Sequence, residues 1–146
     1  SAASDVYKRQ ELQEPVLVEI PLAAFVERIR TLYPDLEWHI SIPLAVTMFT
    51  DENMLRQVLI NLVKNACEAG ATTMDVRWNK ELWISNNGAP IPADVEREIF
   101  VPFFTTKKNG SGIGLSLSRQ MMVRQGRDLC LAERPVPGFQ VTFIVS

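Results

Sequence analysis

Residues 55–69 constrain this chain more than any other segment, because they predict an amphipathic helix whose second face is polar but mostly uncharged. Asn61, Asn65 and Glu68 share that second face, since residues three and four apart are neighbours on a helix. Such a face is typical of a helix that contacts a polar ligand or offers amide oxygens to a metal, and equally of side chains that hydrogen-bond nearby loops. At about 100° per residue, the apolar side chains form one broad stripe: Leu55, Val58, Leu59, Leu62, Val63 and Ala66.

A glycine-rich segment opens a second predicted helix. Residues 107–126 read KKNGSGIGLSLSRQMMVRQG, with Gly110, Gly112 and Gly114 at every second position. Backbone N–H groups and the positive end of a helix dipole would then face one point, which makes an anion site. The segment is not a dinucleotide fingerprint, because no strand immediately precedes it, and not a P-loop, because no Lys-Ser/Thr follows the glycines. By itself the pattern is also that of an ordinary flexible loop.

Two further segments lie between these helices. Residues 82–92, LWISNNGAPIP, predict a short strand that delivers Asn86 and Asn87 to a turn rich in Gly and Pro. Residues 98–107, EIFVPFFTTK, are aromatic at first and then hydroxyl-bearing and basic. This change of character is expected of a segment that packs at one end and meets a ligand at the other.

The composition fits one globular domain and excludes several classes of function. A chain of 146 residues with 47% hydrophobic content can bury a single α/β core. No apolar run approaches the roughly 20 residues of a membrane span, and no secretory signal is visible. A net charge of −2 gives no electrostatic basis for binding nucleic acid. Two Cys and one His predict neither a zinc site nor a disulfide framework, and Cys67 is expected near the core.

The order of the predicted elements gives the fold class. Residues 1–11 are set apart as a non-native or linker leader, and the domain is predicted over residues 12–146. The mixture of elements predicts an α/β (α+β) two-layer sandwich with helices on one face of a mixed, largely antiparallel sheet. Strands are expected at residues 16–20, 36–42, 45–49, 73–78, 81–85, 128–133 and 138–145, and the strands 73–78 and 81–85 are expected to join at Asn79-Lys80. Helices are expected at 22–32, over the 55–69 segment with Thr50 or Asp51 as its cap, and at 115–126, with a turn or short helix at 94–100.

Taken in order, the four segments resemble the ATP-binding catalytic domain of sensor histidine kinases, a Bergerat-fold domain whose superfamily also includes gyrase, Hsp90 and MutL. Residues 61–69 are similar to the N box and residues 86–92 to the first glycine box. Residues 100–107 are similar to the F box and residues 110–115 to the second glycine box. The short spacing between the last two boxes resembles the kinases rather than the other branches. The likeness runs from about residue 15 to the C-terminus.

The resemblance implies roles for the polar face of the first helix. In the family, the second Asn of the N box ligates a Mg²⁺ ion that bridges the phosphates of ATP, and Asn65 stands there. Asn61 is expected to support the same region, and Glu68 to add a hydrogen bond behind it. The hydrolysing branches carry a Glu in place of Asn61, and an amide cannot take a proton from water at neutral pH. The chain is therefore expected to hold ATP without rapid hydrolysis.

Two residues of the first glycine box depart from the family pattern. Asn86 stands where the family usually has an Asp that accepts a hydrogen bond from the adenine amino group, and Pro90 stands where it usually has Gly. Asn86 is expected to accept that bond through its carbonyl oxygen and to donate to the adjacent ring nitrogen. Loss of the charge-assisted bond is expected to weaken ATP binding by about 1 kcal/mol.

The remaining ATP contacts implied by the resemblance lie in the two glycine boxes and the segment between them. Lys107, with Thr106, is expected to reach the terminal phosphate and to act in catalysis together with Asn61 and Asn65. The complete expected set is Asn61, Asn65, Glu68, Asn86, Gly88, Ile91, Phe103, Thr106, Lys107, Gly110, Ser111, Gly112, Ile113, Gly114 and Leu115.

The activity implied is that of a protein-histidine kinase in two-component signal transduction. The phosphoacceptor is expected on a His-bearing dimerisation domain absent from this chain, because the alternating pattern around His39 reads as a strand. The expected partners are ATP with Mg²⁺, that dimerisation domain and, indirectly, a response regulator, but not nucleic acid. The fragment is expected to be a cytoplasmic monomer, whether or not its parent is an inner-membrane sensor. The alternative is a degenerate nucleotide-binding module without phosphotransfer, which Asn86 and Pro90 favour.

Overall fold

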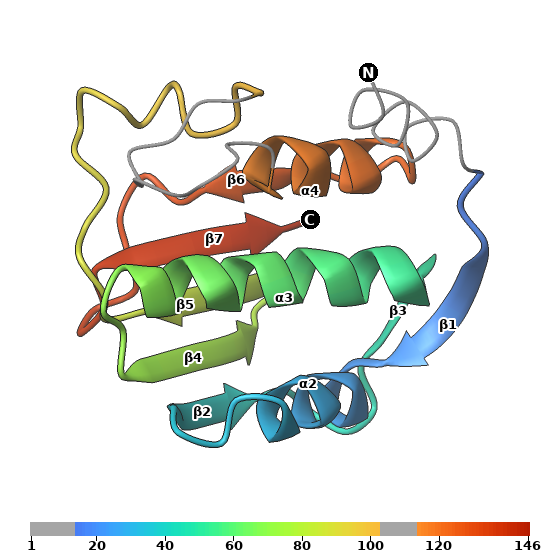
Figure 1. Ribbon diagram of the computed structural model, residues 1–146. Coiled ribbons are helices and arrows are strands. Elements are labelled where there is room, and N and C mark those ends of the chain that lie inside the picture. The colour runs from blue at the N-terminus through green and yellow to red at the C-terminus, as the bar shows by residue number, and fades with distance from the viewer. Residues whose placement is uncertain (1–13, 103–113) are drawn as a thin grey trace.

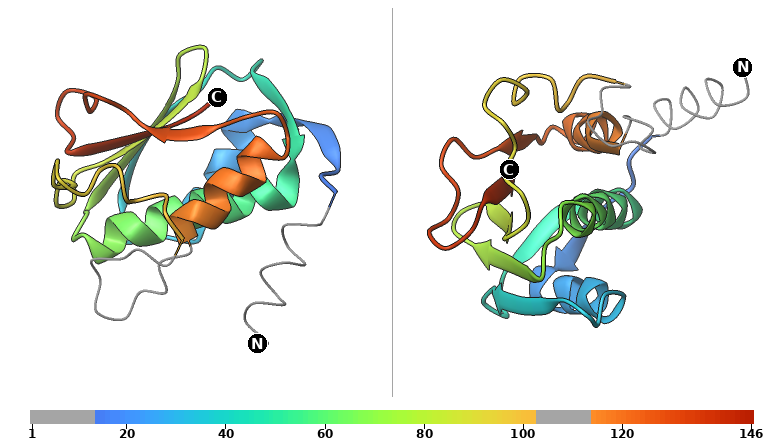
Figure 2. Two further views of the ribbon diagram at one scale, coloured as in Figure 1. Left: turned by 90° about the horizontal axis from the view of Figure 1, so that it is seen from above. Right: turned by 60° about the vertical axis from the view of Figure 1, so that its left-hand side comes forward.

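Two layers make up residues 14–102 and 114–146, the part of the chain that this computed structural model describes. Within these residues, one layer is a five-stranded sheet in the order β2-β4-β5-β7-β6, and three helices lie together on one of its faces (Figures 1 and 2). The strands are β2 (Glu37–Ser41), β4 (Thr73–Trp78), β5 (Leu82–Asn86), β6 (Leu129–Leu131) and β7 (Val141–Val145), and the helices are α2 (Leu22–Thr31), α3 (Glu52–Glu68) and α4 (Gly114–Val123).

The pairing of the strands confirms the predicted mixed, largely antiparallel sheet. Strands β2 and β4 run parallel, whereas β4–β5, β5–β7 and β6–β7 are antiparallel. The predicted tight connection between β4 and β5 is present, and Lys80 occupies the left-handed region there with φ 63°. The Asn79 N–H donates to the Glu81 carbonyl across this turn at 3.0 Å.

Strands β1 (Leu17–Pro21) and β3 (Thr47–Asp51) form a two-stranded antiparallel sheet of their own. Ile20 lies opposite Met48 in its register, and both are buried. The alternation of the sequence predicted both strands but not their separation from the larger sheet, because alternation identifies the buried face of a strand and not its partner.

Helix α3 has a clear start and a clear stop. The carboxylate of Asp51 accepts a hydrogen bond from the Met54 N–H at 2.9 Å, which confirms one of the two predicted caps. All six predicted stripe residues are buried. At the other end Gly70 takes φ +84°, and the N–H groups of Gly70 and Ala71 donate to the carbonyls of Cys67 and Ala66. This is a Schellman motif, which satisfies carbonyls that the helix leaves open.

A partly buried polar cluster joins the amino end of α3 to the turn after α4. The side-chain oxygen of Gln125 accepts from the Thr50 hydroxyl and from the Asp51 N–H, and its amide nitrogen donates to the Met121 carbonyl. The Asp51 carboxylate also accepts from the Val16 N–H at 2.8 Å. Residues far apart in sequence are thus fixed to one another where the small sheet meets the helices.

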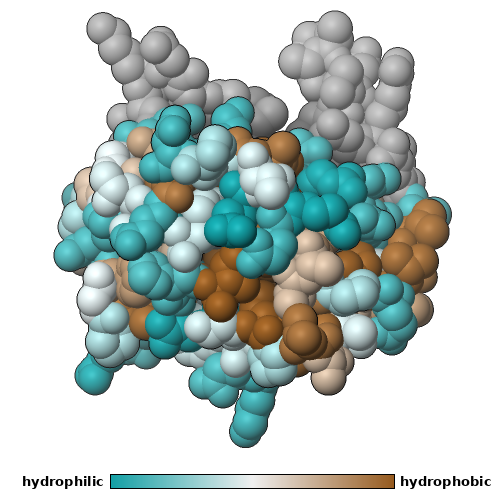
Figure 3. Space-filling view, turned by 90° about the horizontal axis from the view of Figure 1, so that it is seen from below, coloured by the Kyte–Doolittle hydropathy of each residue, from teal (hydrophilic) through white to brown (hydrophobic). Residues whose placement is uncertain are grey.

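The core lies between the helices and the larger sheet. Its largest fully buried side chains include Phe25, Leu55, Met74, Leu82 and Met122, which come from both layers. Figure 3 shows one face of the molecule, where apolar groups lie among hydrophilic ones. Among residues 14–102 and 114–146, none of the helices is both long and apolar enough to cross a bilayer.

Candidate functional site

Asn61 connects α3 to the start of α4. Its side-chain nitrogen donates to the Gly114 carbonyl at 3.3 Å and to the Ser118 hydroxyl at 2.9 Å. Gly114 lies close to the helix, since a Cβ on it would stand 4.0 Å from the Asn61 side chain. Asn61 and Gly114 are 53 residues apart in sequence. The predicted N box and the end of the predicted second glycine box are therefore neighbours in space.

The rest of the polar face of α3 continues toward its carboxyl end. Asn65 is half-buried and Glu68 is exposed, and each has an interaction partner within the protein. The expectation that Cys67 lies near the core is wrong, because its position on the helix is exposed. Partial burial of the thiol, and secondly the charge of Glu68, raise the pKa of Cys67. The thiol therefore stays protonated near neutral pH and supplies no nucleophilic thiolate.

Asn86 is the last residue of β5 and lies beside the carboxyl end of α3. Its side-chain oxygen accepts from the Gly88 N–H at 2.8 Å, and the residue is only 5% exposed. Gly88 has no room for a side chain, since an added Cβ would stand 3.0 Å from that oxygen and 3.1 Å from Ala69. The Ala89 N–H donates to the Ala69 carbonyl at 2.9 Å and so attaches this turn to α3.

Hydroxyl groups that the sequence did not single out support this turn together with Asn87. Ser85 and Thr142 share a buried hydrogen bond of 2.8 Å between β5 and β7, next to Asn86 on the strand. Asn87 accepts from the N–H groups of Thr72 and Thr73 and donates to the Thr72 hydroxyl. Ser118 was also missed, and the available signal was a Ser on the apolar face of a predicted helix.

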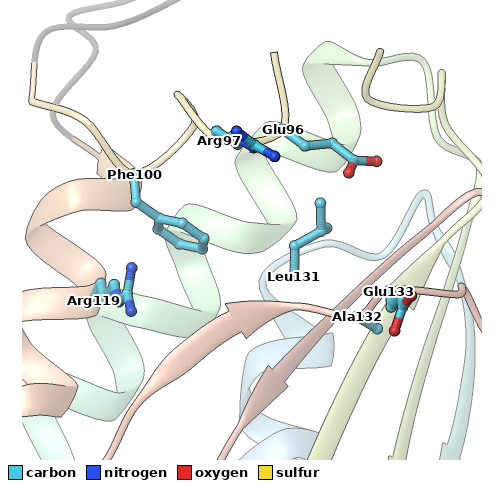
Figure 4. Close-up of a pocket in the computed structure, with 7 residues that line it drawn as sticks. All are labelled: Glu96, Arg97, Phe100, Arg119, Leu131, Ala132 and Glu133. Atoms are coloured by element: carbon cyan, nitrogen blue, oxygen red, sulfur yellow. The ribbon is translucent and has the colours of Figure 1, made fainter. Parts of the chain in front are cut away.

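Successive turns lead away from this region over residues 93–101, where either a turn or a short helix was predicted. Phe100 fixes the end of the turns to the sheet, with its ring edge-on to Phe143 at 6.4 Å and the Arg119 guanidinium at 5.2 Å from its centre. Arg119 also pairs with Asp128 at 3.1 Å. Figure 4 shows Phe100 and Arg119 beside a cavity of about 390 Å³. Its described lining residues include none of the predicted ATP-binding residues.

The described residues thus bring part of the predicted site together. Asn61 meets Gly114, while Asn86 and Gly88 meet the end of the same helix α3. Ile91 and Leu115 pack against the edge of the core. The other predicted contacts lie outside the described residues: Phe103, Thr106, Lys107, Gly110, Ser111, Gly112 and Ile113.

The donor set bears on the expected magnesium ion. Within the described part of the chain, no three His, Cys, Asp or Glu side chains gather in a way that could hold a metal. A single amide oxygen from Asn65 fits a Mg²⁺ ion that takes most of its ligands from phosphate and water.

Comparison with known proteins agrees with this arrangement. Residues 50–146, more than half of the chain, match the family described as histidine kinase-, DNA gyrase B- and HSP90-like ATPase. The chain belongs to this ATPase family. The match begins at Thr50, just before α3, and so includes every predicted site residue.

Relatives of the ATPase domain are sensor kinases. The signal transduction histidine-protein kinase AtoS of Escherichia coli is 35% identical over 101 residues, which cover 64% of this chain and 16% of AtoS. The tetrathionate sensor histidine kinase TtrS of Salmonella typhimurium is 30% identical over 116 residues, which cover 75% of this chain and 19% of TtrS. The chain thus spans less than a fifth of either relative.

Solved structures give the same result for the fold. The nucleotide-free catalytic domain of the histidine kinase ThkA superimposes with a TM-score of 0.74 and 28% identity, covering 89% of this chain and 93% of that domain. The two-layer fold predicted from the sequence is confirmed, and the chain is the ATP-binding catalytic domain of the sensor-kinase type within its family.

Proposed function

We propose that this domain binds Mg²⁺-ATP and transfers the γ-phosphate to a His side chain on a dimerisation domain of its parent kinase. The observation that carries the proposal is the contact of Asn61 with Gly114 and Ser118. It places the polar face of α3 beside the first turn of α4, where backbone N–H groups and the helix dipole favour phosphate.

The bound nucleotide would lie between the turn at Asn86 and Gly88 and the start of α4. Asn86 and Gly88 would contact the base, and Ile91 would pack near it. Asn65 would hold Mg²⁺ through its amide oxygen, with Glu68 behind it, and the ion would neutralise charge on the phosphates. Phosphate contacts would come from Thr106, Lys107 and the backbone of the second glycine box: Gly110, Ser111, Gly112, Ile113, Gly114 and Leu115.

Transfer would be a direct displacement at the γ-phosphorus. An imidazole nitrogen attacks phosphorus, the bond to the bridging oxygen of ADP breaks, and the imidazole gives up its proton on the acceptor domain. Hydrolysis would be slow, because the Asn61 amide is not a base and its nitrogen already donates two hydrogen bonds. Slow hydrolysis would keep ATP available for transfer to a His acceptor instead of to water.

The relatives favour this activity over a nucleotide-binding module without phosphotransfer, since both AtoS and TtrS are histidine kinases. In the cell the domain would act in the cytoplasm and deliver phosphate through the acceptor His to a response regulator. A structure of ThkA in complex with its response regulator TrrA is among the similar folds. The isolated chain would be a monomer.

The test of transfer uses γ-labelled ATP. The chain alone should remain unlabelled, and addition of the His-bearing dimerisation domain of its own parent should give acid-labile phosphohistidine on the added domain. Label on His39 of the isolated chain would contradict the proposed division of labour. Absence of transfer despite measured ATP binding would instead support the binding module.

The role of Asn65 is tested by magnesium dependence. Asn65→Ala should weaken ATP binding with Mg²⁺ far more than ADP binding without Mg²⁺, as measured by calorimetric titration. Asn53→Ala is the matched control, because Asn53 lies exposed on the same helix and bonds only to Arg56 among the described residues. Equal losses with and without Mg²⁺ would mean that Asn65 is structural.

A further inference from the structure

Gly88 determines which way round the Asn86 side-chain amide lies. The Gly88 N–H donates to the terminal atom of Asn86 at 2.8 Å, and a backbone N–H requires an acceptor. The only acceptor at the end of an Asn side chain is its oxygen, Oδ1. The other terminal atom is therefore the nitrogen, Nδ2, which stands where a carboxylate would place its second oxygen.

The turn around Gly88 keeps this orientation. Rotating the amide by half a turn would set two donors, Nδ2 and the Gly88 N–H, against each other. The turn cannot easily move away, because the Ala89 N–H is bonded to the Ala69 carbonyl at 2.9 Å and Gly88 is packed against Ala69. The N–H₂ group is thus held in place by the end of α3.

Nδ2 of Asn86 is a buried donor that has no acceptor among the residues the structure describes. Asn86 is 5% exposed, and within residues 14–102 and 114–146 its Nδ2 makes no hydrogen bond. Alternation along β5 places Asn86 on the same face as Leu82 and Ile84, the face that the helices cover. Buried donors are almost always paired, so this one favours a bound group that accepts a hydrogen bond.

We propose that Asn86 makes the base site permissive, so that it binds 6-oxopurine nucleotides such as ITP about as well as ATP. This inference rests on the proposed function, in which the base lies against Asn86. The adenine 6-amino group is a donor and gains nothing from Nδ2, whereas Nδ2 can donate to adenine N1 or to the O6 of hypoxanthine or guanine.

Each kind of base then receives one hydrogen bond from Asn86. A carboxylate at this position would instead accept from the 6-amino group, and a 6-oxo group would leave that acceptor facing another acceptor. Strong discrimination between ligands arises when the wrong one leaves a buried polar group unpaired. With Nδ2 in this place, neither base is rejected in that way.

The test is calorimetric titration of the chain with ATP and with ITP, which lacks the 6-amino group and also the 2-amino group that would complicate GTP. The dissociation constants for the wild-type chain should agree within about threefold. Asn86→Asp should favour ATP over ITP by about tenfold or more, because one lost or unpaired charged hydrogen bond is worth that factor. Asn87→Asp is the matched control, since it places the same charge one residue away and should leave the ratio unchanged.

The outcomes separate the two proposals. A wild-type chain that prefers ATP over ITP by more than about tenfold overturns the permissive site, whether or not the variants fold. An unchanged ratio in a folded Asn86→Asp chain removes Asn86 from the base contact. A chain that binds neither nucleotide, nor ADP, overturns the proposed function itself. Thermal unfolding of each variant shows that it is folded before binding is compared.

Discussion

The two ends of α3 treat buried polar groups in opposite ways. At the amino end, the buried Thr50 hydroxyl and Asp51 N–H both donate to Gln125. At the carboxyl end, the oxygen of Asn86 is paired with Gly88 but the nitrogen of the same amide has no partner among the described residues. Thr50 and Asn86 are both buried, so burial alone does not distinguish a structural support from a binding site.

The two ends of α3 differ in whether the protein itself supplies a partner for each buried polar group. A fully paired cluster stabilises the fold and gains nothing from a ligand, whereas a buried donor left over is stabilised only when something binds. Substitutions at the amino end should therefore change the free energy of unfolding and leave nucleotide affinity alone. Substitutions at the carboxyl end should change both.

The largest effect is expected for Gln125→Leu. The variant keeps the approximate volume of the side chain but leaves the Thr50 hydroxyl and the Asp51 N–H unpaired in the interior. We expect the free energy of unfolding in urea to fall by about 2–3 kcal/mol, with nucleotide affinity unchanged under conditions where the variant is folded. Gln57→Leu, on the exposed side of α3, should change stability little. A loss of affinity in folded Gln125→Leu would mean that the two ends are coupled.

A smaller change in stability, with a loss of binding, is expected for Gly88→Ala. The added Cβ would stand 3.0 Å from the Asn86 oxygen and 3.1 Å from Ala69, so the turn or the amide must shift. We expect a loss of about 1–2 kcal/mol in the free energy of unfolding and a clear weakening of ATP binding by calorimetry. Ala89→Ser changes an exposed neighbour and should alter neither quantity. Unchanged affinity in Gly88→Ala would separate this turn from the base.

The smallest effect is expected for Glu52→Gln, which removes a charge from the amino end of α3. Glu52 accepts from Arg28 at 3.3 Å and from Arg56 at 3.2 Å, but its side chain is 43% exposed. We expect a loss of no more than about 0.5 kcal/mol in low salt, and less in high salt, because solvent and ions screen exposed pairs. A larger loss, insensitive to salt, would show that this end of α3 depends on its surface charge as well as on Gln125.

Much of the fold could be predicted because the patterns were local. The apolar stripe and the Asp51 cap of α3 and the β4–β5 turn are each set by residues within a few positions of one another. The strand bounds agree within a few residues for the same reason. The parallel pairing of β2 with β4 and the separate β1–β3 sheet could not be predicted, because they depend on partners that alternation does not specify.

The site was predicted less completely, and the reason is again the distance between partners. The order of the four motifs identified Asn61, Asn65 and Asn86 as residues of interest. The contact from Asn61 to Ser118 and the support of Asn86 by Gly88 are features of side-chain geometry, which the sequence does not contain. The assignment of the phosphate contacts of Lys107 and the second glycine box stays a prediction.

The cluster around Gln125 also bears on how the chain folds and unfolds. Thr50 and Gln125 are 75 residues apart, so their hydrogen bond closes a long loop and gains nothing until the elements between them have docked. We expect this contact to be absent from the folding transition state. Stopped-flow measurements on Gln125→Leu should then show an almost unchanged folding rate and a much faster unfolding rate. The hydrogen bond would therefore set how long the native domain persists rather than how quickly it forms.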